Sequence, residues 1–168
     1  MKQLMMSALL VSLLAACGSQ PTKQAAPAPV AKAPAKTEVK AETKPVEINP
    51  LKDPSNILSH RSVYYDFDKS VVKEEYKPMI QAHAAYLVSH GDAKLTLQGN
   101  CDERGSREYN LALGQRRADS VKKLLEAGGA ADAQISTVSF GSEKPRAQGH
   151  NEEAWAQNRR TDIVYQGE

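Results

Sequence analysis

A predominantly apolar run opens the chain and then gives way to small residues. The run covers residues 4–14, Lys2 precedes it, and Leu14-Ala15-Ala16-Cys17 ends it. A run this short cannot span a bilayer, which requires about 20 apolar residues. A positive residue, an apolar run and small residues before a cut are typical of a removable export signal. The pattern predicts a lipoprotein signal peptide over residues 1–16, with lipid attached to Cys17; an ordinary signal peptide with a chance cysteine is the alternative.

The hydrophobic pattern disappears between residue 18 and about residue 57. Seven of the nine prolines lie in this stretch, among Ala, Lys, Thr and Glu, and no aromatic residue does. Such a segment cannot bury enough apolar surface to offset the entropy lost on ordering. We therefore expect lipidated Cys17 and a disordered tether over residues 17–57, with a reach of at most about 130 Å.

A regular pattern of apolar and polar positions returns over residues 58–168, which hold all the aromatic residues. Alternating apolar positions predict strands over residues 62–67, 94–98, 135–140 and 161–165. Three- and four-residue spacing predicts helices from a cap at Ser70 to about Gly91, over residues 107–127 before Gly128-Gly129, and over residues 152–157. The order β-α-β-α-β-(α)-β predicts one α+β domain with a sheet and helices on one or both of its faces.

The same spacing predicts which positions face the core. On the first strand and helix these are Val63, Tyr65, Phe67, Met79, Ile80, His83, Ala84 and Leu87. On the last strand they are Thr161, Ile163 and Tyr165. We expect His83 to be a packing residue because it lies on the apolar face of its helix.

Charge and cysteine content exclude several classes of protein. Residues 60–168 carry 15 Lys and Arg against 16 Asp and Glu, so nucleic-acid binding has little electrostatic support. Lipidation of Cys17 would leave Cys101 without an intramolecular disulfide partner. The histidines show no metal-ligand spacing, and no nucleophile, zinc or phosphate-loop motif is present. We expect neither a cofactor nor catalysis.

One polar segment stands out against this background. Asp102 lies in a predicted loop after the second strand, and Gly105 allows a turn there. On the following helix Asn110, Leu113 and Arg117 share one face. A guanidinium on an apolar face must find acceptors. Asp102 is the natural partner of Arg117, or a ligand is bound between the two.

Several segments carry a resemblance to a known family. They are Val63-Tyr64-Tyr65-Asp66-Phe67-Asp68-Lys69, Ala82-His83-Ala84-Ala85-Tyr86-Leu87, Cys101-Asp102-Glu103-Arg104-Gly105, Tyr109-Asn110-Leu111-Ala112-Leu113-Gly114-Gln115-Arg116-Arg117-Ala118, Phe140-Gly141-Ser142-Glu143-Lys144-Pro145 and Asn158-Arg159-Arg160. In this order they resemble the OmpA-like peptidoglycan-binding domain, and most closely its lipid-anchored members in the Tol-Pal system. The resemblance covers about residues 62–165 and implies a single mixed sheet with helices packed against it.

The resemblance also implies a ligand and a set of binding residues. The ligand is the meso-diaminopimelate of the peptidoglycan stem peptide, whose free end is a zwitterion. Asp102 would bind the ammonium and Arg117 the carboxylate, with Asn110 and Leu113 as walls and Arg104 and Asp68 as supporting contacts. We interpret Arg159 and Arg160 as mainly structural. Cys101 stands where the family commonly has Thr or Ala, and its thiol beside the site is a candidate for oxidation or an intermolecular disulfide.

The biological role follows from the same resemblance. Gly18, where enterobacterial lipoproteins held at the inner membrane have Asp, favours the outer membrane. The expected partners are peptidoglycan, the outer membrane through the N-terminal lipid, and the periplasmic protein TolB, with roles in envelope integrity and cell division. Three alternatives stay open: a merely structural Asp102–Arg117 pair, a wall hydrolase, and a partner-binding lipoprotein without wall affinity.

Overall fold

The computed structural model describes residues 49–167. The signal peptide, Cys17 and most of the predicted tether lie outside these residues. Within residues 49–167, no helix combines the length and the apolar character needed to cross a membrane. The compact unit spans Lys44–Glu168, and because its described part has its own hydrophobic core, we expect this unit to fold without the preceding residues.

Four strands form one mixed sheet in the order β1-β4-β2-β3. The strands are β1 (Ser62–Tyr64), β2 (Leu95–Asn100), β3 (Ile135–Gly141) and β4 (Arg160–Tyr165). β2 and β3 are parallel, and β4 lies antiparallel to both β1 and β2. Insertion of the last strand between the first two produces the mixed sheet, which confirms the fold predicted from the sequence.

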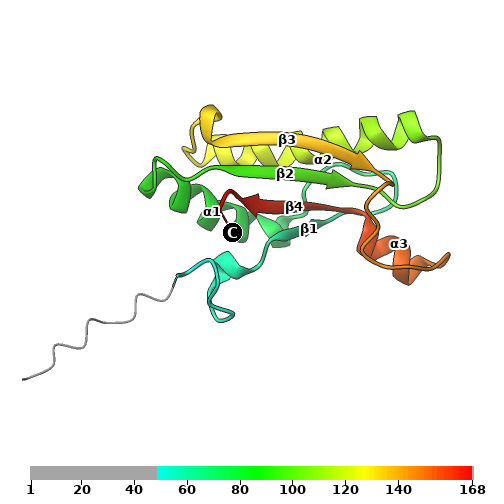
Figure 1. The fold of residues 1–168 in the computed structure, drawn as a ribbon, viewed down its shortest axis with the longest axis horizontal. Coiled ribbons are helices and arrows are strands. Elements are labelled where there is room, and N and C mark those ends of the chain that lie inside the picture. The colour runs from blue at the N-terminus through cyan, green and yellow to red at the C-terminus, as the bar shows by residue number, and fades with distance from the viewer. Residues whose placement is uncertain (1–48, 168) are drawn as a thin grey trace, which may run out of the picture. The chain divides into compact units, whose positions relative to one another are not determined.

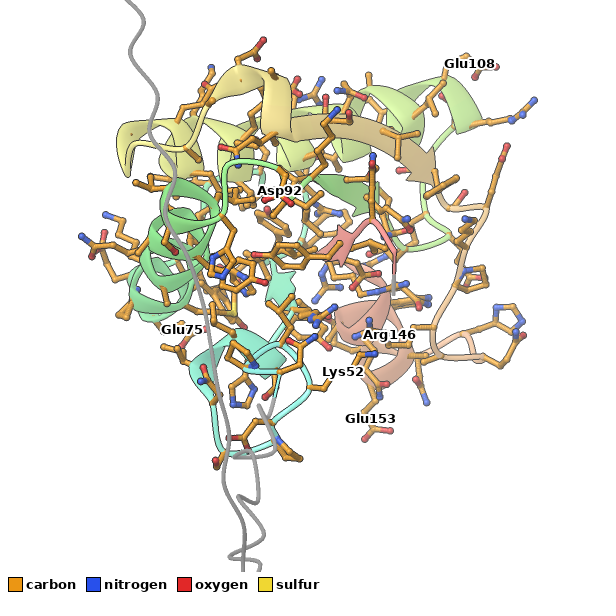
Figure 2. The ribbon with its side chains drawn as sticks, turned by 60° about the vertical axis from the view of Figure 1, so that its left-hand side comes forward. Lys52, Glu75, Asp92, Glu108, Arg146 and Glu153 are labelled. Carbon is orange, nitrogen blue, oxygen red and sulfur yellow. The ribbon has the colours of Figure 1, made fainter. Side chains whose placement is uncertain are left out.

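Within residues 49–167, three α-helices accompany the sheet, and α1 and α2 pack together on one of its faces (Figure 1). They are α1 (Lys77–Ser89), α2 (Arg107–Ala127) and α3 (Glu152–Asn158). Three short 3-10 turns complete the described part: η1 (Ile57–Ser59), η2 (Glu74–Tyr76) and η3 (Asp132–Gln134). Charged side chains such as Glu75, Glu108 and Glu153 lie at the periphery (Figure 2).

The core lies between the sheet and the helices α1 and α2. The predicted apolar face of α1 is confirmed, since its buried residues are Met79, Ile80, His83, Ala84 and Leu87. Thr161, Ile163 and Tyr165 of β4 are also buried, as predicted. Leu51 belongs to the same core, and its carbonyl accepts from Arg61 Nη2 at 2.6 Å. The folded part therefore includes residues that the sequence assigned to the tether.

Two details of the first strand and helix were predicted wrongly. Phe67 is 57% exposed, because β1 ends at Tyr64 and the chain turns away from the sheet. Ser70 does not cap α1, because the turn η2 intervenes and Pro78 then occupies the first turn of the helix. By contrast, α2 begins and ends where the sequence predicts, with Ser106 Oγ accepting from Tyr109 N and Gly128 as its C-cap.

A close glycine contact sets the position of α2 on the sheet. A Cβ at Gly99 would lie 1.9 Å from the carbonyl oxygen of Gly114, and one at Gly114 would lie 2.3 Å from Ser139 Oγ. The helix therefore approaches β2 more closely than any side chain would permit. This contact lies one residue before Asn100, where β2 gives way to the loop that carries Asp102.

Candidate ligand-binding site

A cavity of about 180 Å³ lies where the chain leaves β2 and enters α2. All six residues that the sequence predicted as ligand contacts line it: Asp68, Asp102, Arg104, Asn110, Leu113 and Arg117. The other lining residues are Phe67, Cys101, Gly105, Tyr109 and Arg159. The structure thus brings the predicted residues together, and it adds two exposed aromatic rings and a further guanidinium.

Asp102 is 4% exposed and is held by two arginines. Arg104 Nη2 donates to Asp102 Oδ2 at 2.6 Å, and Arg159 Nη1 donates to the same oxygen at 3.3 Å. The other oxygen accepts from the backbone N–H of Arg104 at 3.1 Å. Burial alone would raise the pKa of Asp102, but the hydrogen bonds from Arg104 and Arg159 outweigh it and leave the pKa below its ordinary value. The carboxyl group is therefore ionised at neutral pH.

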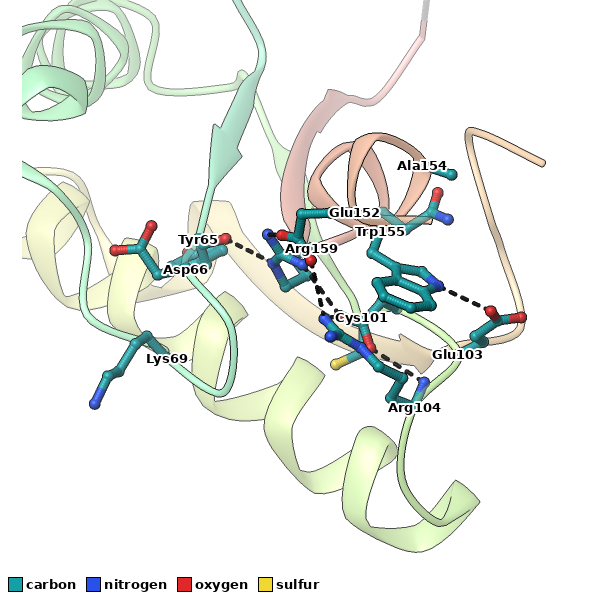
Figure 3. Close-up of polar contacts among 12 residues, drawn as sticks. Tyr65, Asp66, Lys69, Cys101, Glu103, Arg104, Glu152, Ala154, Trp155 and Arg159 are labelled. Atoms are coloured by element: carbon teal, nitrogen blue, oxygen red, sulfur yellow. Dashed lines mark hydrogen bonds and ion pairs between the residues drawn. The ribbon is translucent and has the colours of Figure 1, made fainter. Parts of the chain in front are cut away.

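Arg159 is one of the cavity residues that the sequence did not identify. It is 6% exposed and donates from Nε to Tyr65 O at 3.1 Å and from Nη2 to Glu152 Oε1 at 2.6 Å, besides its bond to Asp102 (Figure 3). It therefore connects the residue that follows β1, the loop after β2, and α3. Arg159 belongs to the Asn158-Arg159-Arg160 segment that carries the family resemblance. The residues around it in the sequence do not indicate that it lies beside Asp102.

Arg117 forms no direct ion pair with Asp102, so of the two alternatives that the sequence left open, the direct pair is not found. It is fully buried, and Nε donates to Lys69 O and Nη1 to Asn100 O, both at 2.8 Å. Nη2 makes a longer contact of 3.5 Å to Asp66 O. Its guanidinium also lies 5.0 Å from the centre of the Tyr65 ring. Arg117 therefore ties α2 to both neighbouring loops while forming part of the cavity wall.

Asn110 fixes the loop that carries Asp102. Its Nδ2 donates to the carbonyl oxygens of Asp102 at 3.2 Å and Arg104 at 3.0 Å. Gly105, with φ of 97°, provides the turn between that loop and the start of α2. The amide of Asn110 is thus a support for the loop as well as a cavity wall.

The outer rim of the cavity is aromatic and partly strained. Asp68 has a φ of 56°, the only non-glycine positive φ among residues 49–167, and its Oδ1 accepts a hydrogen bond from Tyr109 OH. Tyr109 and Phe67 are both exposed. An unusual backbone conformation held by a side-chain contact is typical of functional sites.

Cys101 is not the reactive thiol that the sequence suggested. It is 3% exposed, and its Sγ donates to Asn110 O at 3.3 Å. Burial raises the pKa of the thiol, despite the positive charge of Arg117 nearby. A buried, protonated thiol cannot form an intermolecular disulfide while the domain stays folded.

His83 and Arg160, two of the residues interpreted as structural, lie outside the cavity, whereas Arg159 lines it. His83 is fully buried between Tyr165 OH, 2.9 Å from Nδ1, and His60 O, 3.0 Å from Nε2, which confirms its packing role. Arg160 Nε donates to Asp162 Oδ2 at 2.8 Å on the sheet. Over residues 49–167, no group of three or more His, Cys, Asp or Glu side chains is placed to hold a metal ion.

Comparison with known proteins identifies the family. The model of the OmpA family matches residues 64–159, which is more than half of the chain and includes the whole cavity lining. The chain belongs to the OmpA family.

Relatives within the OmpA family agree with this assignment. The peptidoglycan-associated lipoprotein of Pasteurella multocida is 49% identical over 106 residues, covering 63% of this chain and 71% of the relative. That of Pseudomonas aeruginosa is 42% identical over 113 residues, covering 67% of each. The chain is therefore similar to lipoproteins of that name, and the resemblance inferred from the sequence is confirmed.

Solved structures of other proteins show the same fold. The crystal structure of the peptidoglycan-associated lipoprotein from Burkholderia pseudomallei matches with a TM-score of 0.69 and 54% identity, covering 70% of this chain and all of that one. The C-terminal domain of Helicobacter pylori MotB matches with a TM-score of 0.59 at 20% identity, covering 65% of this chain and 86% of that one. The second likeness concerns the fold alone.

Proposed function

We propose that the protein is an outer-membrane lipoprotein that binds peptidoglycan without catalysis, through the meso-diaminopimelate of the stem peptide. The observation that carries the proposal is that Asp102, Arg117 and four further predicted residues line the same cavity. Its relatives are named peptidoglycan-associated lipoproteins.

The charges of the cavity suit a zwitterion. The free end of diaminopimelate carries an ammonium and a carboxylate on one carbon, so a receptor needs a carboxylate and a planar two-pronged donor. Asp102, ionised and buried, is the acceptor for the ammonium. Arg117, whose Nη2 has a long 3.5 Å contact to a carbonyl, is the donor for the carboxylate. Leu113 and Asn110 contact the carbon chain, with Asp68 and Arg104 at the rim.

The anchor completes the proposed role. Lipid on Cys17 would hold one end in the outer membrane, and the residues between Cys17 and the folded unit would be the tether to the wall. Many weak contacts between two fixed surfaces add up through effective concentration. We also propose TolB as a protein partner in competition with the wall, on the resemblance to the lipid-anchored members of the Tol-Pal system.

Co-sedimentation of the unit 44–168 with purified sacculi tests the proposal. The parent should sediment with the sacculi, and Asp102→Asn, which keeps the shape of the side chain, should lose roughly 2–5 kcal/mol of binding free energy. Asp132→Asn is the matched control, because Asp132 is exposed and pairs with Lys122 away from the cavity. Failure of the parent to sediment would replace wall binding with the partner-binding alternative, and TolB would be the first partner to test.

A further inference from the structure

The carboxylate proposed to bind the ligand's ammonium already has a cationic partner at close range. Arg104 Nη2 lies 2.6 Å from Asp102 Oδ2, whereas Arg159 Nη1 lies 3.3 Å from the same oxygen. A further cation cannot take that shorter contact while Arg104 keeps it. Asp102 Oδ2 already accepts from two guanidinium groups, so an ammonium that binds this oxygen has to displace one of them.

Arg104 and Arg159 differ in how firmly they are held. The Arg159 side chain is 7% exposed and has three acceptors on three different elements. The Arg104 side chain is 32% exposed, and its Nε has no hydrogen-bond partner. Among the arginines that line the cavity, Arg104 is half-buried, and Arg117 and Arg159 are buried. Arg104 is therefore the group that can leave Asp102.

Two aromatic rings form cation–π contacts with the Arg104 guanidinium. Its central carbon lies 4.2 Å from the centre of the Phe67 ring and 4.1 Å from that of Trp155, and Trp155 lies beside Arg104 in Figure 3. Cation–π contacts at this range stabilise a guanidinium without fixing it to one acceptor. The two rings therefore continue to stabilise the positive charge of Arg104 when the hydrogen bond between Arg104 and Asp102 is broken.

A second carboxylate lies within reach of the same nitrogen. Glu152 Oε2 is 3.7 Å from Arg104 Nη2, and the Glu152 side chain is 62% exposed. Its other oxygen accepts from Arg159, which holds the carboxylate at this place. A small movement of Arg104 would thus exchange one carboxylate partner for another.

We propose that Arg104 occupies the place on Asp102 that the ligand's ammonium takes, and that binding moves the Arg104 guanidinium between Phe67 and Trp155 toward Glu152. This inference rests on the proposed function, because it concerns the same site. The ammonium of the ligand takes the place of the Arg104 guanidinium beside Asp102, so the buried carboxylate is not left unpaired. A ligand without a cation cannot make that replacement. Arg104 is therefore a specificity-determining residue that favours zwitterions over simple carboxylates.

The single tryptophan of the chain reports this movement directly. Trp155 is the only tryptophan in the sequence, and its emission depends on the charge stacked on its ring. Titration of the unit 44–168 with free meso-diaminopimelate, followed by fluorescence and calorimetry, should give a saturable change in Trp155 emission with the same dissociation constant as the heat. Pimelate, which has the same carbon chain without amino groups, should leave the emission unchanged.

Substitution of Arg104 tests whether this residue competes with the ligand for Asp102 or helps to bind the ligand. Arg104→Gln removes the competing cation, so meso-diaminopimelate should bind about fivefold more tightly, as expected for release of one partly exposed ion pair. Arg107→Gln is the matched control, because Arg107 forms an exposed pair with Glu143 at 2.6 Å outside the cavity lining. The control should change neither affinity nor emission.

The outcomes distinguish this inference from the proposed function. Heat of binding in the parent without a change in Trp155 emission would overturn the movement of Arg104 and leave diaminopimelate binding intact. Weaker binding by Arg104→Gln would show that Arg104 supports the ligand, which also overturns the inference. Absence of any binding heat in the parent would overturn both.

Discussion

Arg159 Nη1 donates to Asp102 Oδ2 at 3.3 Å, across a separation of 57 residues in the chain. Both side chains are buried, and Arg159 also binds Tyr65 O and Glu152. The position of the Asp102 carboxylate therefore depends on the start of β4 as much as on its own loop. The cavity therefore takes its shape only when β4 is in place in the sheet, because Arg159 directly precedes that strand.

Removal of the Arg159 charge should destabilise the domain. Arg159→Met leaves Asp102 with one guanidinium fewer and leaves Tyr65 O without its side-chain donor, so urea unfolding should show a loss of about 2–4 kcal/mol. Arg146→Met is the control, since the Arg146–Asp162 pair has a more exposed arginine and should contribute at most about 1 kcal/mol. Equal losses in both variants would contradict the role assigned to Arg159.

The glycine contact between β2 and α2 should tolerate no side chain. Gly99→Ala places a methyl group 1.9 Å from Gly114 O, a backbone atom that can move only with the helix. We expect a loss of about 3 kcal/mol or more in the free energy of unfolding, with weaker ligand binding because α2 carries Arg117. Gly91→Ala, with open space around its Cβ, should be nearly neutral. A stable Gly99→Ala variant would show that the helix is less closely packed than described.

His83 should make the domain less stable in mild acid. Burial lowers the pKa of His83 below its ordinary value of 6.5, and the positive charge of Arg61 acts in the same direction. The unfolded chain then takes up a proton at a higher pH than the folded one. The stabilising contribution is complete above about pH 6.5 and is lost as the pH falls below it, by about 1 kcal/mol between pH 7.5 and 5.5.

Urea unfolding at these two pH values measures the effect. His83→Gln should remove the pH dependence in this range, whereas exposed His90→Gln should keep it. The carboxyl groups whose pKa is lowered in the folded state, such as Asp102, lose their contribution to the free energy of unfolding only in more acidic solution. A pH dependence that survives in His83→Gln would assign it to another group.

Cys101 should be unreactive in the folded unit 44–168, where it is the single cysteine. Its burial and raised pKa predict that a thiol-reactive dye labels it only after denaturation. The labelling rate in buffer and in denaturant provides the measurement, with the unfolded chain as the positive control. Rapid labelling of the native unit would restore the redox hypothesis that burial now opposes.

Local pattern was sufficient for most elements of the fold. Residues 107–127 were predicted as a helix from their three- and four-residue spacing and from the stop at Gly128-Gly129, and α2 has those bounds. The apolar spacing likewise predicted the buried faces of α1 and β4. The family motifs predicted six of the eleven residues that line the cavity.

The errors arise where distant segments decide the outcome. A direct pair with Asp102 was one of two alternatives for Arg117, but its Nε instead reaches Lys69 O, 48 residues earlier. The contact of Arg159 with Asp102 depends on the antiparallel placement of β4, which no local spacing reveals. The cap at Ser70 failed because the turn η2 precedes α1.

The most direct test of the account compares sacculi that contain meso-diaminopimelate with sacculi that contain lysine at the same position of the stem peptide. The two side chains differ by one carboxylate, which is the group assigned to Arg117. The unit 44–168 should co-sediment with diaminopimelate sacculi and show little binding to lysine sacculi. Equal binding to both would contradict recognition of the zwitterion in this cavity.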